Sequence, residues 1–179
     1  MTRHLAKLVF LGLGTNLGDR GENLKKAIAM IGEKVGTVVS CSSVYETEPW
    51  GFQSENEFLN AVVKVRTELK PPGLLGRILM IEAQLGRLRE GEGMGYKSRI
   101  IDIDILLYGH EIINKKSLQI PHPRIPVRKF VLVPLCEISP EMVHPVLKKT
   151  FAELLEECKD EGIVIRKNPL PLKIPSGEG

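Results

Sequence analysis

The sequence predicts one α+β domain in which helices pack on a mainly antiparallel sheet. Four segments are rich in branched and aromatic apolar residues and are bounded by turn-forming residues, which is typical of strands. Two other segments place apolar residues three and four positions apart, which is typical of helices. Their order is strand, helix, strand, strand, helix, strand, and this βαββαβ order predicts a ferredoxin-like core.

The first half of the chain supplies a strand, a helix and two more strands. Residues 8–13 form a short apolar run that ends in Gly and Asn, so a buried strand fits it better than a signal peptide. Apolar residues keep helical spacing over 21–34. Residues 37–47, rich in Val, Ser, Cys and Tyr, predict a second strand, and 58–65 predict a third after a polar loop.

The second half continues with a helix and the clearest strand of the sequence. Two prolines open the helix at residue 71. The strand over 100–108 ends in Gly109, which starts a turn into a short hairpin. After Phe130 the letters VLVPL are typical of a strand, and 150–159 predict a short amphipathic helix. The hairpin and this last helix are additions to the ferredoxin-like core.

We expect a single domain over residues 1–162 and an extended or disordered tail over 163–179. The last thirteen residues, KNPLPLKIPSGEG, contain three prolines and two glycines, and such a composition buries little apolar surface. No repeats and no stretch as long as a membrane span are present in the sequence.

Charge and cysteine content exclude some classes of protein. A formal net charge of +3 is too small to indicate nucleic-acid binding without a basic cluster. The three cysteines form no CxxC pair, so neither a disulfide framework nor a zinc site is indicated. We therefore expect a protein of the reducing cytoplasm, without a nucleic-acid or membrane partner.

The segment IIDIDILLY carries the sharpest chemical signal. Alternation along a strand puts Ile101, Ile103, Ile105 and Leu107 on one face, and puts two aspartates, then Leu106 and Tyr108, on the other. Aspartates at i and i+2 lie about 7 Å apart, so a pair of Mg²⁺ ions roughly 4 Å apart fits between them and phosphate oxygens. The alternative is a half-exposed strand with an acidic outer face, and the apolar residues on that face weigh against it. The candidate metal ligands are Asp102 and Asp104.

Basic residues gather on both sides of this strand in the sequence. Arginine forks suit polyphosphate oxygens, and a solvated basic surface or a nucleic-acid patch is the alternative. The residues are Arg87, Arg89, Lys97, Arg99, Arg124, Arg128 and Lys129.

Aromatic residues are scarce, at 5%, yet several lie near polar loops. Phe58 and Asn60 are two apart on a strand and so share a face, while Trp50, Phe52 and Phe130 lie elsewhere in the chain. Two rings can sandwich a heterocycle and an amide can bind its edge. Ordinary core packing is the favoured alternative on the residues alone.

Two glycine-rich stretches give weaker signals. GLGTNLGD lacks the GK[ST] ending of a phosphate loop and fits a strand-to-helix turn better. GEGMGYK could close over a nucleotide or be a plain connector.

Between Leu8 and Leu155 the chain closely resembles the 6-hydroxymethyl-7,8-dihydropterin pyrophosphokinase family of folate biosynthesis. The resemblance rests on motifs in the same order: GTNLGDR, SSVYETEPWG, FLNAVV, IEAQLGR, IDIDILLYG and IPHPR. It implies transfer of pyrophosphate from ATP to the hydroxymethyl oxygen of the pterin, with release of AMP. It also implies two Mg²⁺ ions, ATP as co-substrate, and a monomer.

The same resemblance implies roles for residues that match the motifs. Reaction and metal binding would fall to Arg87, Arg99, Asp102 and Asp104. ATP and its phosphates would be held by Glu82, Arg87, Arg89, Lys97, Arg99, His122 and Arg128. The pterin would be held by Thr47, Trp50, Phe58, Asn60 and Phe130.

The chain departs from the family pattern just before the aspartate strand, where many members have Gly-Pro-Arg. Here the stretch from Gly95 to Arg99 is one residue longer, so Lys97 can share the role given to Arg99. Two other classes of function stay open: a nucleotidyltransferase or kinase for another alcohol, and a ferredoxin-like RNA-binding or ligand-binding module. RNA binding on such a sheet predicts exposed aromatic residues on the central strands, where this chain has aspartates.

Overall fold

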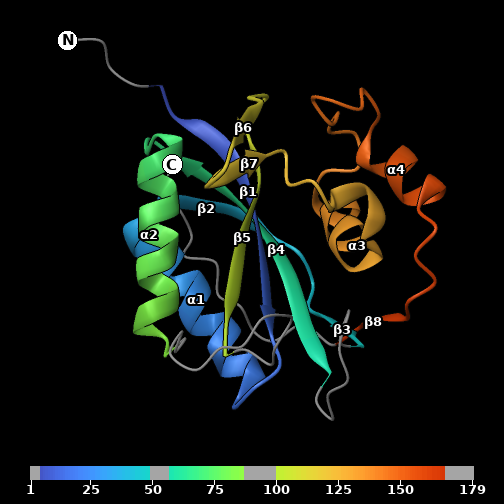
Figure 1. Ribbon diagram of the computed structural model, residues 1–179. Helices are drawn as coiled ribbons and strands as arrows, with labels where there is room; N and C mark the ends of the chain where they lie inside the picture. The colour runs from blue at the N-terminus through green and yellow to red at the C-terminus, as the bar shows by residue number, and fades with distance from the viewer. Residues whose placement is uncertain (1–4, 49–56, 87–99, 168–179) are drawn as a thin grey trace.

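The computed structural model describes residues 5–48, 57–86 and 100–167 (Figure 1). The elements in chain order are β1 (Lys7–Thr15), α1 (Arg20–Lys34), β2 (Thr37–Cys41), β3 (Tyr45–Thr47), β4 (Phe58–Thr67), α2 (Pro71–Gln84), β5 (Asp102–Tyr108), β6 (Ile113–Lys115), β7 (Leu118–Ile120), the 3-10 helix η1 (Ile125–Val127), α3 (Lys129–Ile138), α4 (Phe151–Glu157) and β8 (Val164–Arg166).

Within the described residues the main sheet has six strands, in the order β5-β1-β4-β3-β8, and β2 pairs with β4 as well. Each of these pairings is antiparallel. The strands β1, β2, β4 and β5, with α1 between the first two and α2 between the last two, form the predicted βαββαβ unit. The ferredoxin-like α+β fold is therefore confirmed, and so is the extra hairpin, which is β6 paired with β7.

Helices α1, α2 and α4 begin as their sequences predict, and α3 is an exception that is described below. At α1 the carboxylate of Asp19 accepts a hydrogen bond from the N–H of Glu22 at 3.1 Å, which caps the helix. Pro71 lies in the first turn of α2, where a missing N–H costs nothing. Thr150 and Glu153 form a capping box at α4. No helix in the described ranges has the length and apolarity to cross a membrane.

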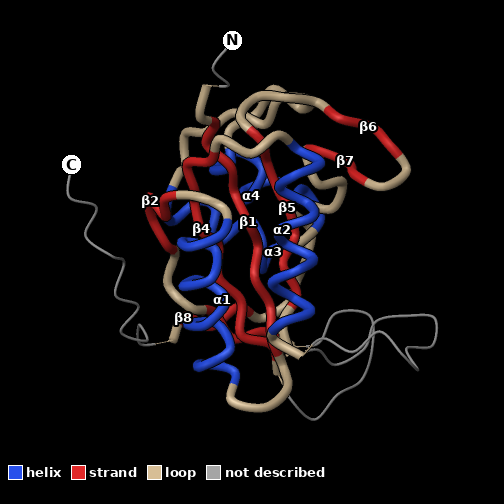
Figure 2. Tube along the Cα trace, turned by 90° about the vertical axis from the view of Figure 1, so that its left-hand side faces the viewer, coloured by secondary structure: helices blue, strands red, loops and turns tan. Residues whose placement is uncertain are grey.

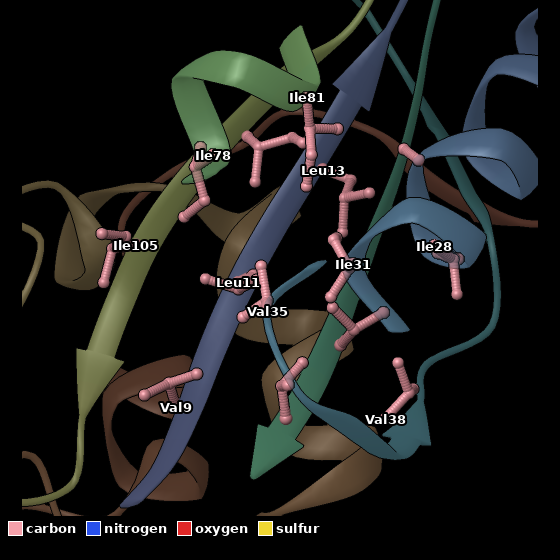
Figure 3. Packing of buried hydrophobic residues seen from close by; sticks show 14 of the residues in the cluster. Val9, Leu11, Leu13, Ile28, Ile31, Val35, Val38, Ile78, Ile81 and Ile105 are labelled. Carbon is pink, nitrogen blue, oxygen red and sulfur yellow. The ribbon is translucent and has the colours of Figure 1, made fainter. Parts of the chain in front are cut away.

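The sheet carries a hydrophobic core on each face. One face packs on α1 and α2, and its sheet residues include Leu11, Leu13 and Ile105 (Figure 3). The other face packs on α3 and α4, through Phe10 and Val62 of the sheet. Figure 2 shows α1 and α2 along the sheet, with α3 and α4 behind it. Helices therefore cover both faces of the sheet. The pair α3 and α4 covers its face only in part.

The prediction of one strand over 37–47 is wrong, because β2 and β3 are separate strands on the same side of β4. Between them Ser42 takes the place of a regular ladder: its N–H donates to the carbonyl of Val62 at 2.8 Å. Its hydroxyl accepts from the Val62 N–H at 2.9 Å. β2 itself also contains a register shift between Val38 and Ser40, which composition alone does not reveal.

The prediction of a strand at VLVPL is also wrong: the segment belongs to helix α3. Its buried residues Val131, Leu132 and Leu135 recur at helical spacing and pack on Phe10 and neighbouring sheet residues. A continuous apolar run does not distinguish a strand from a buried helix. Pro134 lies inside this helix and lacks the N–H of an ordinary helical residue.

The predicted faces of β5 hold only up to Leu106. A register shift opposite Phe10 and Leu11 makes Leu106 an extra residue in the strand. As a result Leu107 packs on the α3–α4 side and Tyr108 on the α1–α2 side, the reverse of simple alternation. The aspartates precede this bulge and keep their predicted face.

Residues 164–166, which the sequence assigns to the tail, form β8 at the edge of the sheet. β8 pairs with β3, and the N–H of Lys167 donates to the carbonyl of Val44 at 2.9 Å. Figure 1 shows β3 and β8 side by side at the lower right. The paired part of the chain thus extends to Lys167, and the prediction for the residues after it lies outside the described residues.

Candidate active site

The register of the sheet brings the candidate polar residues into one row across three strands. Gly14 on β1 is paired with Asp102 on β5 and with Asn60 on β4. In the next row Gly12 is paired with Asp104. Paired residues share a face, so the aspartates and Asn60 lie on the face that α3 and α4 cover only in part. Adjacent strands lie about 4.8 Å apart, which puts the Asp102 and Asn60 backbones about 10 Å apart across a glycine.

The two aspartates are partly exposed on this face, as a cation site requires. No group of three or more His, Cys, Asp or Glu side chains that could hold a metal occurs among the described residues. Two carboxylates without a third protein ligand fit Mg²⁺, which keeps waters and takes phosphate oxygens as further ligands. The donor set at Asp102 and Asp104 therefore fits a metal that arrives with a phosphate-bearing substrate.

Asn60 and Thr47 form a buried polar pair beside the aspartate row. The Asn60 Nδ2 donates to the Thr47 hydroxyl at 2.7 Å, and both residues are nearly enclosed. This bond fixes the amide plane, so the amide oxygen lies on the Gly14 side, where it would be 3.2 Å from a Cβ on that residue. Phe58 is paired with Thr47 and lies on the same face. A ring and an oriented amide thus stand next to each other, as sequence alternation predicted.

His122 follows the hairpin and is held by its own backbone and ring. Its N–H donates to the carbonyl of Leu106 at 2.9 Å, which ties the loop to β5. The ring Nδ1 accepts from the N–H of Arg124 at 3.2 Å, so the neutral imidazole carries its proton on Nε2 as a donor. Burial, with Arg128 and Arg124 nearby, lowers the pKa of His122 to about 4, and Asp102 partly opposes this.

Arg128 and Phe130 come together at the start of α3. Arg128 is the N-cap residue of that helix and is 8% exposed. Its guanidinium carbon lies 5.6 Å from the centroid of the Phe130 ring, which is within the range of a cation–π contact. Since α3 packs on β3 and β4, it brings Phe130 to the side of the sheet that carries Phe58.

A pocket of ≈ 350 Å³ lies at the open edge of β5, next to Asp104. Its volume is within the range of small-molecule sites. The walls come from α2, β5, the β6–β7 hairpin and the loop after it. Its lining residues are Leu75, Ile103, Asp104, Ile105, Lys116, Ser117, Leu118, Gln119, His122, Pro123 and Arg124. The pocket combines aliphatic walls with the side chains of Lys116 and Arg124 and with Asp104.

Most of the described candidate residues lie either around the Asn60–Thr47 pair or at the pocket next to Asp104. Glu82 lies at neither place. Glu82 is buried on α2 and is not among the residues that line the pocket. The candidates Trp50, Arg87, Arg89, Lys97 and Arg99 lie outside the described residues.

Sequence reasoning missed the hairpin contribution of Lys116, Leu118 and Gln119 to the pocket. Their only signal is position, because they come shortly before His122 in the chain.

The fold and site together define a class: a ferredoxin-like domain with paired carboxylates next to a cationic pocket. The family model for 7,8-dihydro-6-hydroxymethylpterin-pyrophosphokinase (HPPK) matches residues 10–140. The chain therefore belongs to the HPPK family. The expectation drawn from its motifs is confirmed.

Curated relatives agree over most of their length. The chain is 45% identical over 139 residues to a 2-amino-4-hydroxy-6-hydroxymethyldihydropteridine pyrophosphokinase from Porphyromonas gingivalis, covering 77% of this chain and 94% of the relative. It is 42% identical over 149 residues to the Aquifex aeolicus protein of the same name, covering 83% of this chain and 91% of that one.

Solved structures share the fold at low sequence identity. An HPPK-DHPS chain from Plasmodium falciparum gives a TM-score of 0.71 at 20% identity, covering 86% of this chain. An HPPK-DHPS chain in complex with substrates gives a TM-score of 0.69 at 16% identity, with the same coverage. This chain spans 46% and 43% of the length of those two chains, respectively.

Proposed function

We propose that the chain transfers pyrophosphate from ATP to the hydroxymethyl group of 6-hydroxymethyl-7,8-dihydropterin, releasing AMP, as a step of folate biosynthesis. The observation that carries the proposal is the row Asn60, Gly14, Asp102, with the pocket opening at Asp104 in the next row. A flat acceptor lying over the glycine would meet an oriented amide at one end and carboxylates at the other.

The acceptor half of the site suits a pterin. The amide of Asn60 offers a donor and an acceptor to the edge of a heterocycle, and Thr47 keeps that amide in one orientation. Phe58 and Phe130 supply aromatic faces from the sheet and from α3. Thr47 and Trp50 would complete the pocket with backbone groups. The hydroxymethyl arm would then point along the row toward the aspartates.

The nucleotide half lies at the β5 edge. Leu75 and Ile105 give the pocket apolar walls that suit a purine, and Lys116 and Arg124 give it positive charge. His122, neutral and protonated on Nε2, donates to a phosphate oxygen without the cost of keeping a buried imidazolium. Arg128, with Glu82, Arg87, Arg89, Lys97 and Arg99, would hold the rest of the nucleotide.

Mg²⁺ fits the proposal, because Asp102 lies in the row with Asn60 and Asp104 lines the nucleotide pocket, so the two carboxylates stand between the acceptor half and the nucleotide half. Two bound Mg²⁺ ions would neutralise charge on the phosphate oxygens. The side chains align the acceptor oxygen with the β-phosphorus, so that positioning and charge supply the rate enhancement.

The bond changes are those of a phosphoryl-type transfer. The hydroxymethyl oxygen forms a bond to the β-phosphorus, the bond from that phosphorus to the α-phosphate oxygen breaks, and AMP leaves. The hydroxyl proton passes to solvent or to a phosphate oxygen. Arg87 and Arg99 are proposed to stabilise the charge that builds on the transferring group.

The test is an incubation of purified protein with ATP, Mg²⁺ and 6-hydroxymethyl-7,8-dihydropterin, with nucleotide products separated by chromatography. AMP is expected only when the pterin and Mg²⁺ are both present. ADP instead would indicate an ordinary kinase, and pyrophosphate release a nucleotidyltransferase. If the folded protein forms no AMP, ADP or pyrophosphate, the proposal that it acts on this pterin is contradicted.

The metal assignment has its own test. Asp102→Asn and Asp104→Asn are each expected to lower turnover at least about a hundredfold, because each removes a charged ligand. Glu111→Gln, at an exposed acid paired with Lys7 at 4.0 Å, is the control and keeps full turnover. Near-normal rates in either aspartate variant, or full activity in EDTA, would contradict the metal role.

We also propose that the enzyme acts as a monomer in the cytoplasm. The described cysteines, Cys41, Cys136 and Cys158, are free thiols, as expected of a protein in a reducing compartment. Size-exclusion chromatography with light scattering tests the monomer, and a mass near twice 19.9 kDa would contradict it.

A further inference from the structure

Residues 160–167 lie beyond the region that the family model matches, which ends at residue 140. They follow α4 and contain β8. Figure 1 shows this part of the chain running from α4 down to the edge of the sheet beside β3. The segment contacts both α3 and β3, the two elements that carry Phe130 and Thr47.

The contact with α3 occurs at both ends of the helix. At its start, the Asp160 Oδ2 accepts from the N–H of Lys129 at 3.0 Å, next to Phe130. Near its end, Arg166 Nη2 lies 3.7 Å from Glu137 Oε2. An aspartate at a helix start and a cation near its end both complement the helix dipole. The segment therefore contacts α3 near both of its ends.

The contact with β3 combines backbone pairing with charge. Tyr45, Glu46 and Thr47 pair with residues 164–166 in an antiparallel ladder. Lys167 Nζ lies 3.0 Å from Glu46 Oε1, and this contact is the largest cause of the lowered pKa of Glu46. Without β8, β3 would be a three-residue edge strand bonded on one side, and such strands pair weakly.

Glu137 joins the two contacts. Its Oε2 accepts a hydrogen bond from the backbone N–H of Ser43 at 3.1 Å. The carboxylate also accepts a hydrogen bond from the Tyr45 hydroxyl. Burial and the charge of Glu137 raise the pKa of Tyr45. Arg166, on the strand paired with Tyr45, binds the same carboxylate. A helix residue, a β3 residue and a β8 residue therefore meet at one group.

We propose that residues 160–167 position the acceptor half of the site by fixing the separation between α3 and β3, and so between Phe130 and the Thr47–Asn60 pair. The inference rests on the proposed pterin site. It assigns positioning roles to Asp160, Arg166 and Lys167, which do not touch the reacting atoms. Because β8 and β5 are at opposite edges of the sheet, the nucleotide pocket lies outside the reach of these contacts.

Two variants of the segment test the proposal. Lys167→Ala removes the ion pair with Glu46 and is expected to raise the KM for the pterin about two- to fivefold, as suits a partly exposed pair. Ile165→Pro removes a ladder donor: since Lys167 bonds to β3 and such bonds alternate, the Ile165 N–H also faces β3. It is expected to raise that KM on the order of tenfold. The KM for ATP stays within twofold in both.

Each variant has a matched control. Lys149→Ala removes a lysine of the same side-chain exposure as Lys167, 2.6 Å from the more exposed Glu157 and away from the sheet, and leaves both KM values unchanged. Val164→Pro alters a residue of the same strand whose N–H faces away from β3, and has a smaller effect than Ile165→Pro. Lys167→Arg keeps the positive charge, so its KM for the pterin is expected to match that of the wild type and not that of Lys167→Ala.

A second readout separates failure of this inference from failure of the proposed function. Hydrogen exchange at the amides of residues 45–47 is expected to speed up in Lys167→Ala and Ile165→Pro, whatever reaction the enzyme performs. If wild-type protein makes no AMP, the proposed function fails, and exchange still tests the link to β3. Unchanged pterin KM in folded variants, or equal losses for pterin and ATP, would overturn the positioning role.

Discussion

The side-chain amide of Asn60 can extend over β1 because the residue paired with it there is Gly14, which has no side chain. A Cβ on Gly14 would lie 3.2 Å from the Asn60 Oδ1 and 3.7 Å from the Phe58 Cδ1. The first distance is tighter than an ordinary van der Waals contact, so a side chain at this position displaces the amide. The absence of a side chain at Gly14 is therefore part of the candidate acceptor site.

Gly14→Ala is expected to weaken pterin binding about five- to thirtyfold, because shifting a hydrogen-bonding amide costs about 1–2 kcal/mol. Titration calorimetry with the pterin measures the change. Gly12→Ala is a matched control, since its Cβ would meet Leu106 at 3.3 Å and not Asn60. Equal pterin affinity in the two variants would show that Gly14 has no special role.

His122 gives a prediction about pH. Burial, with the charges of Arg128 and Arg124, lowers its pKa from 6.5 to about 4, so the ring is neutral at pH 7. Between these values the unfolded chain binds a proton that the folded protein does not. The free energy of unfolding therefore falls as the pH drops from 6.5 toward 4, and this contribution is fully present above 6.5.

An NMR titration of the His122 ring in ligand-free protein is expected to show a midpoint near 4. Adding inorganic triphosphate is expected to raise the midpoint, because an anion beside the ring favours the imidazolium. The His122→Gln variant identifies the resonance. A midpoint near 6.5 without ligand would contradict the buried, cation-flanked environment described for this ring.

Local alternation predicted the site only in part. The shared face of Asp102 and Asp104, and that of Phe58 and Asn60, follow from the period of a strand and are found. The meeting of these two pairs at Gly14 depends on the register of three strands, which no local pattern contains. The pocket at β5 likewise depends on where the hairpin folds back, and so on tertiary structure.

At the scale of elements, the prediction succeeded where amphipathic periodicity is clear and failed where a segment is buried on all sides. α1 shows four buried residues at helical spacing and lies where expected. VLVPL is apolar throughout, and its helical state is decided by packing of α3 on Phe10 and Val62. The bulge at Leu106 could not be predicted for a related reason: both faces of β5 are buried there, so apolar residues are found on either face and the alternation gives no register.

Two glycines predict opposite effects on element stability. Gly36 joins α1 to β2, and a Cβ there would lie 2.1 Å from the carbonyl oxygen of Arg66. Because a backbone atom cannot yield as a flexible side chain can, Gly36→Ala is expected to lower the free energy of unfolding by about 1–3 kcal/mol or more. The close approach of this turn to β4 thus requires glycine.

Gly76 is exposed within α2, and no atom lies within 4 Å of the position that a Cβ on this residue would take. Gly76→Ala is therefore expected to raise the free energy of unfolding by up to about 1 kcal/mol, the difference in helix propensity between the two residues. Urea denaturation followed by circular dichroism measures both variants. A stabilised Gly36→Ala protein would contradict the tight contact between this turn and β4.

At the scale of the whole molecule, one sheet serves two cores. Residues of β1 alternate between them: Leu11 faces α1 and α2, whereas Phe10 faces α3 and α4. Because the same strands form the wall of both cores, loss of one core exposes the sheet and weakens the other. The candidate site depends on both, since β5 is packed by α2 and Phe130 is carried by α3.

This coupling predicts a single unfolding transition. Ile78 is 1% exposed in the first core and Leu132 is 0% exposed in the second. Ile78→Ala and Leu132→Ala are each expected to lower the free energy of unfolding by about 2–5 kcal/mol, the usual range for a buried aliphatic side chain. Circular dichroism and hydrogen exchange of the two cores should then give coincident urea transitions for each variant. If Leu132→Ala instead released α3 and α4 at a urea concentration where β1, β4 and α1 stay protected, the second core would be a separate unit. The acceptor half of the site could then open while the rest of the fold persists.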